Sequence, residues 1–294
     1  MFVVTLVGSE AIGQGDIAEA RDRLNAASCA AGEWRWIDQD KAADIFFADN
    51  AVAARAALAG IAQGIDVIVQ PVSSREKKLI VADMDSTMIT VECIDELADY
   101  AGIKDQIAEI TERAMQGELD FAEALRARVA LLKGLDDAVI DQCRLERVKI
   151  MPGAKALIGT MRSRGARAIL VSGGFTRFTG PVAAEIGFDT AFANVLDIVD
   201  GKLTGTVCDP IVDAARKRFE LGAAMAQHRL PREATLAVGD GANDIPMIEA
   251  AGLGVAYHAK AKARAAADAE IVYGDLSVLL YAQGIGRSDW VELP

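Results

Sequence analysis

Residues 79–90 read Leu79-Ile80-Val81-Ala82-Asp83-Met84-Asp85-Ser86-Thr87-Met88-Ile89-Thr90. Four apolar residues without a polar break are typical of a strand that is buried on both faces, as in a parallel sheet. Ligands of such sheets bind beyond the carboxyl ends of the strands. The stretch therefore predicts two carboxylates, Asp83 and Asp85, at the edge of a sheet where catalytic groups are usually found.

This pair of carboxylates is compatible with two kinds of chemistry. One carboxylate can attack an electrophile and form a covalent intermediate while the other transfers a proton. Together they can also hold a hard divalent cation, which prefers oxygen ligands. The same residues, followed by Ser86 and Thr87, also suit a solvated turn that caps a helix. The motif alone leaves these interpretations open.

The composition indicates a folded protein with a sizeable core. The chain has 294 residues, of which 52% are hydrophobic and 25% charged, enough for one large domain or two smaller ones. The formal net charge is −12. Because nucleic acids and anionic membranes both select basic surfaces, we expect neither as a partner.

The cysteines and histidines exclude several classes of site. The four cysteines lie far apart and form no Cys-x-x-Cys pair, which indicates a reducing compartment without a disulfide framework or a zinc site. Two histidines make a His-based metal site or a Ser-His-Asp triad an unfavourable interpretation. No signal peptide and no apolar run of about 20 residues are evident, so we expect a cytoplasmic protein.

The first 75 residues predict a small α+β domain. Strand patterns alternate with helical patterns in the order β-α-β-β-α-β, which matches the ferredoxin-like split unit. The strands are expected at 2–8, 34–37, 44–47 and 65–72, and the helices at 16–28 and 51–62. This order resembles the ACT family of regulatory amino-acid-binding domains. A dimerisation module that supports a homodimer, or a packing module, is the alternative.

Residues 76–294 predict a larger α/β domain with a parallel sheet. Helical sequence from about 88 to 150, with breaks expected at Gly102, Gly117 and Gly134, forms an insert after the first strand. Beyond it strands alternate with helices, and Asp200-Gly201 marks the turn of a hairpin. Further strands are expected at 166–171, 192–193, 235–238, 252–257 and 270–273.

Three of the buried strands end in polar clusters. They are Asp83/Asp85, Ser172-Gly173-Gly174 and Asp240-Gly241-Ala242-Asn243-Asp244. If the strands are parallel neighbours, the clusters meet at one edge of the sheet. The Ser172 hydroxyl and the two following glycines suit the binding of an anion. This convergence predicts a single site.

A cation and a metal complete the predicted chemistry. Lys217, in a helix expected at 214–228, would add positive charge against phosphoryl oxygens. Asp240 would complete a magnesium site with Asp83 and the backbone carbonyl of Asp85, because Mg²⁺ typically takes one or two carboxylates together with phosphate and water. The combination favours phosphoryl transfer.

These stretches, together with Gly239, resemble the four motifs of the haloacid dehalogenase superfamily of phosphatases. The spacing over residues 76–285 resembles the branch that hydrolyses O-phospho-L-serine. Supporting similarity covers 91–97, 111–121 and 252–260. The resemblance implies a HAD-like Rossmannoid sheet with a helical cap, in addition to the N-terminal ACT-like domain.

The resemblance also implies a reaction and a set of roles. The reaction is the Mg²⁺-dependent hydrolysis of O-phospho-L-serine to L-serine and phosphate, the last step of serine biosynthesis. Asp83 is implied as the nucleophile that forms an aspartyl-phosphate, and Asp85 as the acid and then the base. The phosphate would be held by Ser172, Gly173, Lys217 and Asn243. Mg²⁺ would be held by Asp83, Asp85 and Asp240, with Asp244 as a supporting residue.

The remaining implied contacts concern the amino-acid part of the substrate. Glu92 and Arg128 are implied to bind its ammonium and carboxylate groups, and an Arg can meet a carboxylate with two hydrogen bonds. Met115 and Phe121 match the apolar wall. Two other functions stay open: a phosphatase or phosphotransferase for another small phosphomonoester, and an amino-acid-sensing regulatory protein.

Overall fold

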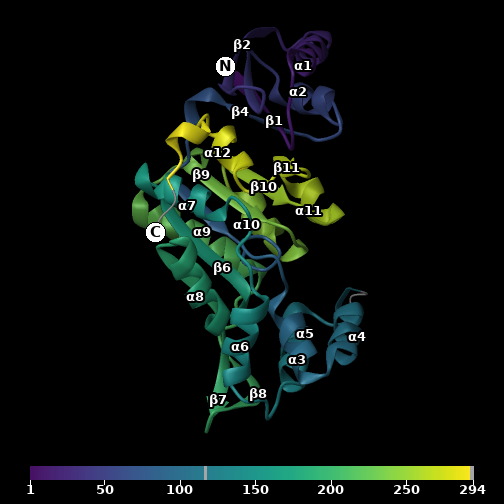
Figure 1. Cartoon of the computed structure of the whole chain (residues 1–294), viewed down its shortest axis with the longest axis vertical. Coiled ribbons are helices and arrows are strands. Elements are labelled where there is room, and N and C mark those ends of the chain that lie inside the picture. Colours follow the sequence, from purple (N-terminus) through teal and green to yellow (C-terminus); the bar gives the residue numbers. More distant parts are fainter. Residues whose placement is uncertain (116–117, 292–294) are drawn as a thin grey trace.

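The computed structural model describes residues 1–115 and 118–291, which fold around two β-sheets (Figure 1). A four-stranded sheet is formed by residues 2–71, and a seven-stranded sheet by residues 79–271. Among the described residues, no helix has both the length and the apolar character needed to cross a bilayer.

The smaller sheet has the predicted β-α-β-β-α-β order. Its elements are β1 (Phe2–Gly8), α1 (Gln14–Ala26), β2 (Ala31–Asp38), β3 (Ala42–Phe47), α2 (Ala51–Leu58) and β4 (Ile65–Pro71). The strands lie in the order β2-β3-β1-β4, and each neighbouring pair is antiparallel. The predicted ferredoxin-like fold is therefore confirmed, and it is consistent with an ACT-like domain.

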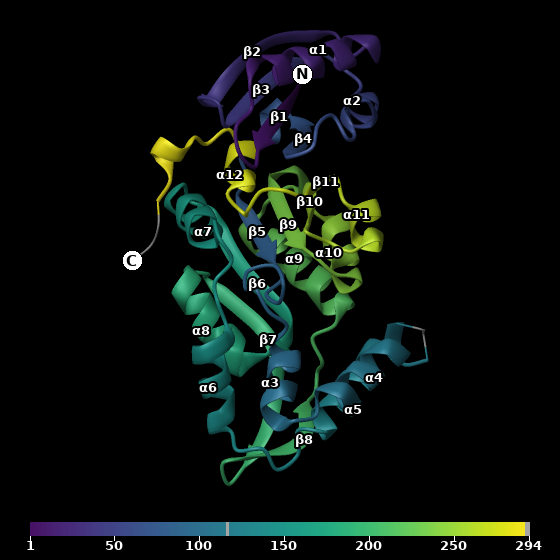
Figure 2. The ribbon, with the colours of Figure 1, turned by 45° about the vertical axis from the view of Figure 1, so that its right-hand side comes forward.

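Both faces of this small sheet are buried, which explains the long apolar runs of its strands. Leu6 and its neighbours on one face share a core with Leu24 of α1 and Leu58 of α2. Val7 and Ile68, on the other face, belong to the core of the larger sheet. There the small sheet lies against α12 (Val278–Ala282), as Figure 2 shows.

Two buried side chains join the small sheet to segments that flank the larger sheet. Arg75 donates to both carboxylate oxygens of Asp44, at 2.7 and 2.9 Å, and to the carbonyl of Ala282 at 3.1 Å. Asp66 accepts hydrogen bonds from the three consecutive amides of residues 272–274, at 2.8, 3.1 and 2.7 Å. Because each hydrogen bond to a charged group contributes about 1.5–3 kcal/mol, these contacts stabilise one relative orientation of the sheets.

The larger sheet places the first motif at its centre. Its strands are β5 (Leu79–Ala82), β6 (Arg167–Phe175), β7 (Thr190–Val199), β8 (Lys202–Cys208), β9 (Thr235–Gly239), β10 (Leu253–Tyr257) and β11 (Ala269–Ile271). They lie in the order β11-β10-β9-β5-β6-β7-β8, and all neighbours are parallel except β7 and β8. The predicted parallel sheet is confirmed.

Helices cover both faces of this sheet. Ile80 and Leu170 share a core with α7 (Ala154–Ser163) and α8 (Thr176–Ile186). Val81 and Ile169, on the opposite face, share a core with α9 (Ala214–His228) and α10 (Ile245–Ala250). The four residues of β5 are buried on both faces, as their unbroken apolar run predicted. A short helix, α11 (Ala261–Ala266), lies between β10 and β11 in the chain.

A helical cap follows β5. It consists of α3 (Cys93–Ala101), α4 (Lys104–Met115), α5 (Phe121–Ala130) and α6 (Ala138–Arg147). The two connections to the sheet pair with each other, since the amide of Thr90 donates to Lys149 at 3.0 Å and that of Met151 to Met88 at 2.9 Å. The predicted breaks at Gly102 and Gly134 occur, whereas Gly117 lies outside the described residues.

The cap is also attached to the β7–β8 hairpin. The amide of Gly134 donates to the carbonyl of Leu203 at 2.8 Å, and the amide of Leu203 donates to Leu135 at 2.9 Å. In Figures 1 and 2 this hairpin extends from the sheet to the far end of the cap. The cap is therefore held at its connections and at the hairpin.

Candidate active site

The three predicted polar clusters lie at the carboxyl ends of three neighbouring strands. β5 lies between β9 and β6, and the three strands are parallel. Their carboxyl ends therefore meet at one edge, where the amide of Asp83 donates to the carbonyl of Val238 at 3.0 Å. Strand order thus brings together segments that are about 90 and 160 residues apart in the chain.

The centre of this edge is a buried lysine between two carboxylates. Lys217 Nζ lies 2.7 Å from an oxygen of Asp83 and 2.7 Å from an oxygen of Asp244. The side chain of Asp213 caps α9 by accepting a hydrogen bond from the Arg216 amide at 2.8 Å, and so sets the first turn that carries Lys217. Burial opposes the charge of Lys217, but Asp244 and Asp83 outweigh it, and the pKa of its ammonium group is raised.

The carboxylates outnumber the ammonium group that neutralises them. Oxygen atoms of Asp83, Asp240 and Asp244 lie within 4.8 Å of one another. Burial and then Asp244 raise the pKa of Asp83 well above its usual value, although Lys217 acts in the opposite direction. Burial, Asp244 and Glu92 raise the pKa of Asp240 to about 6. This set of oxygen donors fits a hard divalent cation, which would keep the carboxylates ionised.

The orientation of Asp244 depends on two glycines. Its second carboxylate oxygen accepts a hydrogen bond from the amide of Gly241 at 3.0 Å. A Cβ atom on Gly239 would lie 2.4 Å from the Asp244 carboxyl carbon. The chain therefore needs glycine at position 239 for this carboxylate to reach Lys217.

The Ser172-Gly173-Gly174 segment differs from its predicted form. The sequence predicted that the strand ends at Val171, but β6 continues to Phe175, and its pairing with β7 becomes irregular between these two residues. The glycines permit this bulge while the flanking residues stay paired. Ser172 is buried, and its hydroxyl accepts a hydrogen bond from the amide of Gly174 at 2.8 Å.

Asp85 faces the same segment rather than the carboxylate cluster. A Cβ atom on Gly174 would lie 2.9 Å from an Asp85 carboxylate oxygen. The other oxygen accepts a hydrogen bond from the amide of Cys93, at the start of α3, at 3.4 Å. Burial and then the charge of Glu92 raise the pKa of Asp85 to about 7. Its side chain thus lies apart from the three clustered carboxylates.

The cap contributes charged and aromatic side chains to this edge. Glu92 accepts a hydrogen bond from the Ser86 hydroxyl at 2.7 Å. Burial lowers the pKa of Arg128, on α5, against the opposing influence of Asp95, Glu92 and Asp85.

A Cβ atom on Gly173 would lie 3.0 Å from the ring of Phe121, so α5 covers the Ser172–Gly174 segment. The side chain of Met115 lies outside the described residues.

Two asparagines lie beside the glycines of the site. Asn243, half-buried, lies so close to Gly241 that a Cβ atom on that glycine would be 2.3 Å from its side-chain oxygen. Asn194 of β7, which the sequence analysis missed, donates a hydrogen bond to the carbonyl of Gly173 at 2.8 Å. The only signal in the sequence was an amide within an otherwise apolar strand pattern, Ala191 to Leu196.

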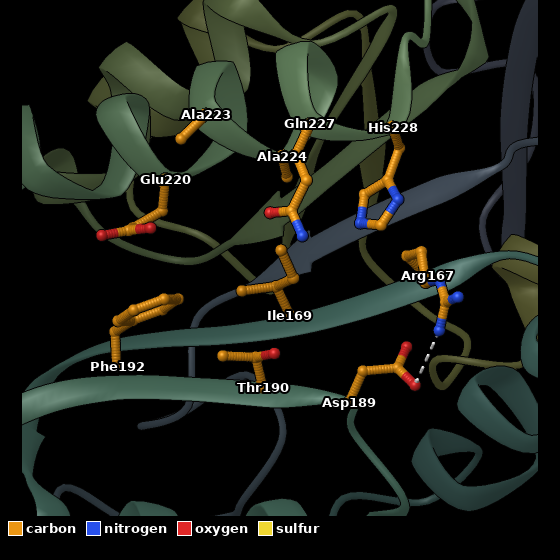
Figure 3. Close-up of a pocket in the computed structure, with 10 residues that line it drawn as sticks. All are labelled: Arg167, Ile169, Asp189, Thr190, Phe192, Glu220, Ala223, Ala224, Gln227 and His228. Carbon is orange, nitrogen blue, oxygen red and sulfur yellow. Dashed lines mark ion pairs between the residues drawn. The ribbon is translucent and has the colours of Figure 1, made fainter.

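A cavity of about 400 Å³ lies away from these residues, between β6, β7 and α9 (Figure 3). Its carboxylates are already paired. Asp189 lies 2.8 Å from Arg162 and 3.7 Å from Arg167, and Glu220 is paired with Arg216. None of the predicted site residues lines this cavity, and we assign no function to it.

The class of protein follows from this fold and site. Residues 80–249 match the family model of haloacid dehalogenase-like hydrolases, and the chain belongs to this family. The resemblance stated from the motifs is therefore confirmed, as is the predicted HAD-like fold. Enzymes of this class generally use a divalent metal, in agreement with the acidic cluster at Asp83.

Within the family, the chain is similar to phosphoserine phosphatases. It is 46% identical over 240 residues to that of Streptomyces coelicolor, covering 82% of this chain and 58% of the relative. It is 46% identical over 215 residues to that of Albidiferax ferrireducens, covering 71% of this chain and 91% of the relative. The chain spans about three-fifths of the length of the first of these relatives.

A solved structure extends the similarity to both sheets. The unliganded structure of a probable phosphoserine phosphatase from Vibrio cholerae has a TM-score of 0.77 and 32% identity. The superposition covers 98% of this chain and 87% of that chain. The arrangement of the N-terminal unit beside the larger sheet therefore also occurs in a relative.

Proposed function

We propose that this chain is a Mg²⁺-dependent phosphoserine phosphatase, which hydrolyses O-phospho-L-serine to L-serine and phosphate. The observation that carries the proposal is the buried contact of Lys217 with Asp83, beside the bulge that contains Ser172. A cation paired with a carboxylate at the edge of a parallel sheet suits in-line transfer of a phosphoryl group. The phosphoserine phosphatases among the relatives support the choice of substrate.

In the first step, a carboxylate oxygen of Asp83 attacks the phosphorus atom and forms an aspartyl-phosphate. The bond from phosphorus to the serine oxygen breaks, and Asp85 gives its proton to that oxygen, so that L-serine leaves. In the second step, Asp85 takes a proton from water, whose oxygen attacks the phosphorus and releases phosphate and Asp83. Asp85 thus ends each cycle protonated, as it began.

The other residues of the site would bind and orient the phosphoryl group and the metal ion. Ser172, the Gly173 segment, Lys217 and Asn243 would contact the phosphoryl oxygens. Mg²⁺, when bound by Asp83, Asp240 and the backbone carbonyl of Asp85, with Asp244 beside them, supplies positive charge that offsets the repulsion between substrate and carboxylates. Lys217 supplies a second positive charge, between Asp83 and Asp244.

The cap selects the amino-acid part of the substrate. Glu92 would bind the ammonium group, and Arg128 the carboxylate, so that one zwitterion contacts both signs of charge. Phe121 covers the Gly173 segment and would exclude water once the substrate is bound. Residues from about 88 to 150 therefore serve as a lid in this proposal.

The proposed domain roles follow the two sheets. Residues 1–75 form an ACT-like unit that regulates the enzyme or mediates a homodimer, and residues 76–294 form the phosphatase domain. We place the enzyme in the cytoplasm, because all four cysteines are free thiols and a reducing compartment preserves them.

Phosphate release from O-phospho-L-serine, with and without Mg²⁺, tests the proposal. Wild-type protein should release phosphate only with the metal, and Asp83→Asn should release none above background. Phosphothreonine and a sugar phosphate measure selectivity. Faster release from the sugar phosphate would instead favour a phosphatase for another phosphomonoester. No release from any ester, together with serine binding, would favour an amino-acid sensor.

A further inference from the structure

Asn194 joins two segments of the candidate active site through one buried side chain. It is 1% exposed and lies on β7 opposite Phe175 of β6. Its amide nitrogen donates to the carbonyl of Gly173 at 2.8 Å, and its amide oxygen accepts from the amide of Val212 at 2.8 Å. Both halves of the side chain are therefore occupied by backbone groups of other segments.

The first hydrogen bond orients the bulge that contains Ser172. A peptide group is planar, and its carbonyl and amide point in opposite directions. Since Asn194 holds the carbonyl of Gly173, the amide of Gly174 must point away from β7, where it donates to the Ser172 hydroxyl at 2.8 Å. The Asn194 side chain thus sets the orientation of the peptide group between Gly173 and Gly174, and with it the side of the bulge toward which the Gly174 N–H points.

The second hydrogen bond holds the segment that leads to the lysine. Val212 precedes Asp213, the residue that caps α9. The carbonyl of Asp213 accepts a hydrogen bond from the amide of Lys217 at 3.0 Å. Asn194 therefore connects the anion-binding bulge and the first turn of the helix that carries the ammonium group.

We propose that Asn194 is a positioning residue of the phosphoryl site, which sets the Ser172–Gly174 bulge and Lys217 at the distance that one phosphoryl group requires. The inference rests on the proposed function only in assuming that this site binds a phosphoryl group. Asparagine is suited to the task because one short, rigid group carries both a donor and an acceptor. Aspartate has the same shape but cannot donate, and its charge would repel the Gly173 carbonyl.

A merely structural role is the alternative, and the chain contains a matched control. Gln283 is 5% exposed, accepts from the amide of Lys77 at 2.9 Å and donates to the carbonyl of Leu279 at 2.9 Å. Like Asn194, it satisfies one backbone donor and one backbone acceptor. Lys77 precedes β5, whereas Asp83 follows it, so Gln283 lies at the opposite edge of the sheet.

The test compares Asn194→Asp and Asn194→Ser with Gln283→Glu and Gln283→Ser. Three quantities are measured in Mg²⁺: orthophosphate affinity by calorimetry, kcat and KM for O-phospho-L-serine and for p-nitrophenyl phosphate, and the thermal midpoint. We expect the Asn194 variants to lose about 10- to 100-fold in orthophosphate affinity and in kcat, as expected for small misplacements of binding groups. The loss should be similar for both esters, because they share only the phosphoryl group.

The Gln283 variants should lose stability to a comparable extent but change kcat and orthophosphate affinity by less than about twofold. If the Asp variant does not fold, the Ser variant decides. Asn194 variants with wild-type orthophosphate affinity and kcat would overturn the inference, as would wild-type protein that binds no orthophosphate. A wild type that binds orthophosphate but does not hydrolyse phosphoserine refutes the proposed function alone, and the orthophosphate titrations still decide the role of Asn194.

Discussion

Lys217 Nζ lies 2.7 Å from Asp83 Oδ1, although the two residues are 134 positions apart in the chain. Both groups are almost completely inaccessible to solvent. Their pairing leaves the nucleophile proposed for phosphoryl transfer beside a permanent positive charge.

Lys217→Met should unfold more easily and lose phosphatase activity. Removing the ammonium group leaves Asp83 and Asp244 buried without their cation, and breaking a buried pair in this way costs about 3–5 kcal/mol. The free energy of unfolding in urea and the rate of phosphate release measure both effects. Arg218→Met, at the next and exposed position, is the control and should change neither by much. An equal effect of both substitutions would refute the assignment of Lys217.

Asp85→Asn should discriminate between leaving groups. An alkoxide such as that of serine needs a proton as it departs, whereas p-nitrophenolate leaves without one. We expect the rate of the first chemical step to fall roughly 10²- to 10⁴-fold with phosphoserine and much less with p-nitrophenyl phosphate. Single-turnover measurements separate this step from the hydrolysis of the aspartyl-phosphate. Equal losses with the two esters would exclude a general-acid role.

Arg128→Ala should weaken phosphoserine binding selectively. The loss of a charge-assisted contact to the substrate carboxylate corresponds to roughly 10- to 100-fold in KM. A sugar phosphate, which lacks this carboxylate, should be affected far less. Arg126→Ala is the matched control, because Arg126 lies on the same helix but pairs with the exposed Asp209 at 2.8 Å. If the sugar phosphate suffers the same loss, the contact is assigned wrongly.

Gly205→Ala should loosen the attachment between the cap and the hairpin. Gly205 has a φ of +83°, and its Cβ atom would lie 2.9 Å from Lys133 Cβ and 3.2 Å from the carbonyl oxygen of Ala130. Strain and overpacking together should lower the free energy of unfolding by about 1–3 kcal/mol. Gly180→Ala, in α8 with open space around its Cβ position, should stabilise the protein by up to about 1 kcal/mol. Urea titrations of both variants check the contrast.

Lys77 should make stability depend on pH in the alkaline range. Burial lowers the pKa of its ammonium group from 10.5 to about 8, against the opposing charges of Asp268 and Glu233. Between these values the unfolded chain holds a proton that the folded chain has released, so stability rises with pH. This contribution is complete above pH 10.5 and is lost as the pH falls through 8.

Urea unfolding of wild type and Lys77→Met at pH 7.5 and 9.5 measures this effect. The advantage of the wild type over the variant should grow by on the order of 1–2 kcal/mol between the two pH values. Lys78→Met is the control, because the Lys78 side chain is 43% exposed, and its difference from wild type should stay nearly constant. A constant difference for Lys77→Met would contradict the prediction.

The sequence alone determined the local elements and the polar clusters that lie at the strand ends. The apolar run Leu79–Ala82 identified the central strand, and α9 has the predicted bounds of 214–228. The Asp200-Gly201 pair predicted the hairpin turn, where both residues have positive φ. Such features depend on neighbours in the chain, through backbone preferences and the alternation of buried side chains, so they can be read directly from the residues.

Only the tertiary structure decided which side chains meet. The sequence offered the backbone carbonyl of Asp85 to the metal and named Asp244 only as a supporting residue. In the structure the carboxylate of Asp244 clusters with those of Asp83 and Asp240, while the side chain of Asp85 turns toward Cys93. It also did not indicate that Asn194 bridges Gly173 and Val212. These contacts arise from the strand order β9-β5-β6-β7 and from a bulge in β6, which place distant segments within hydrogen-bond distance. Hydrophobic patterns specify that a strand is buried but not which strand lies beside it, so the partners of a buried polar group appear only when the sheet is assembled.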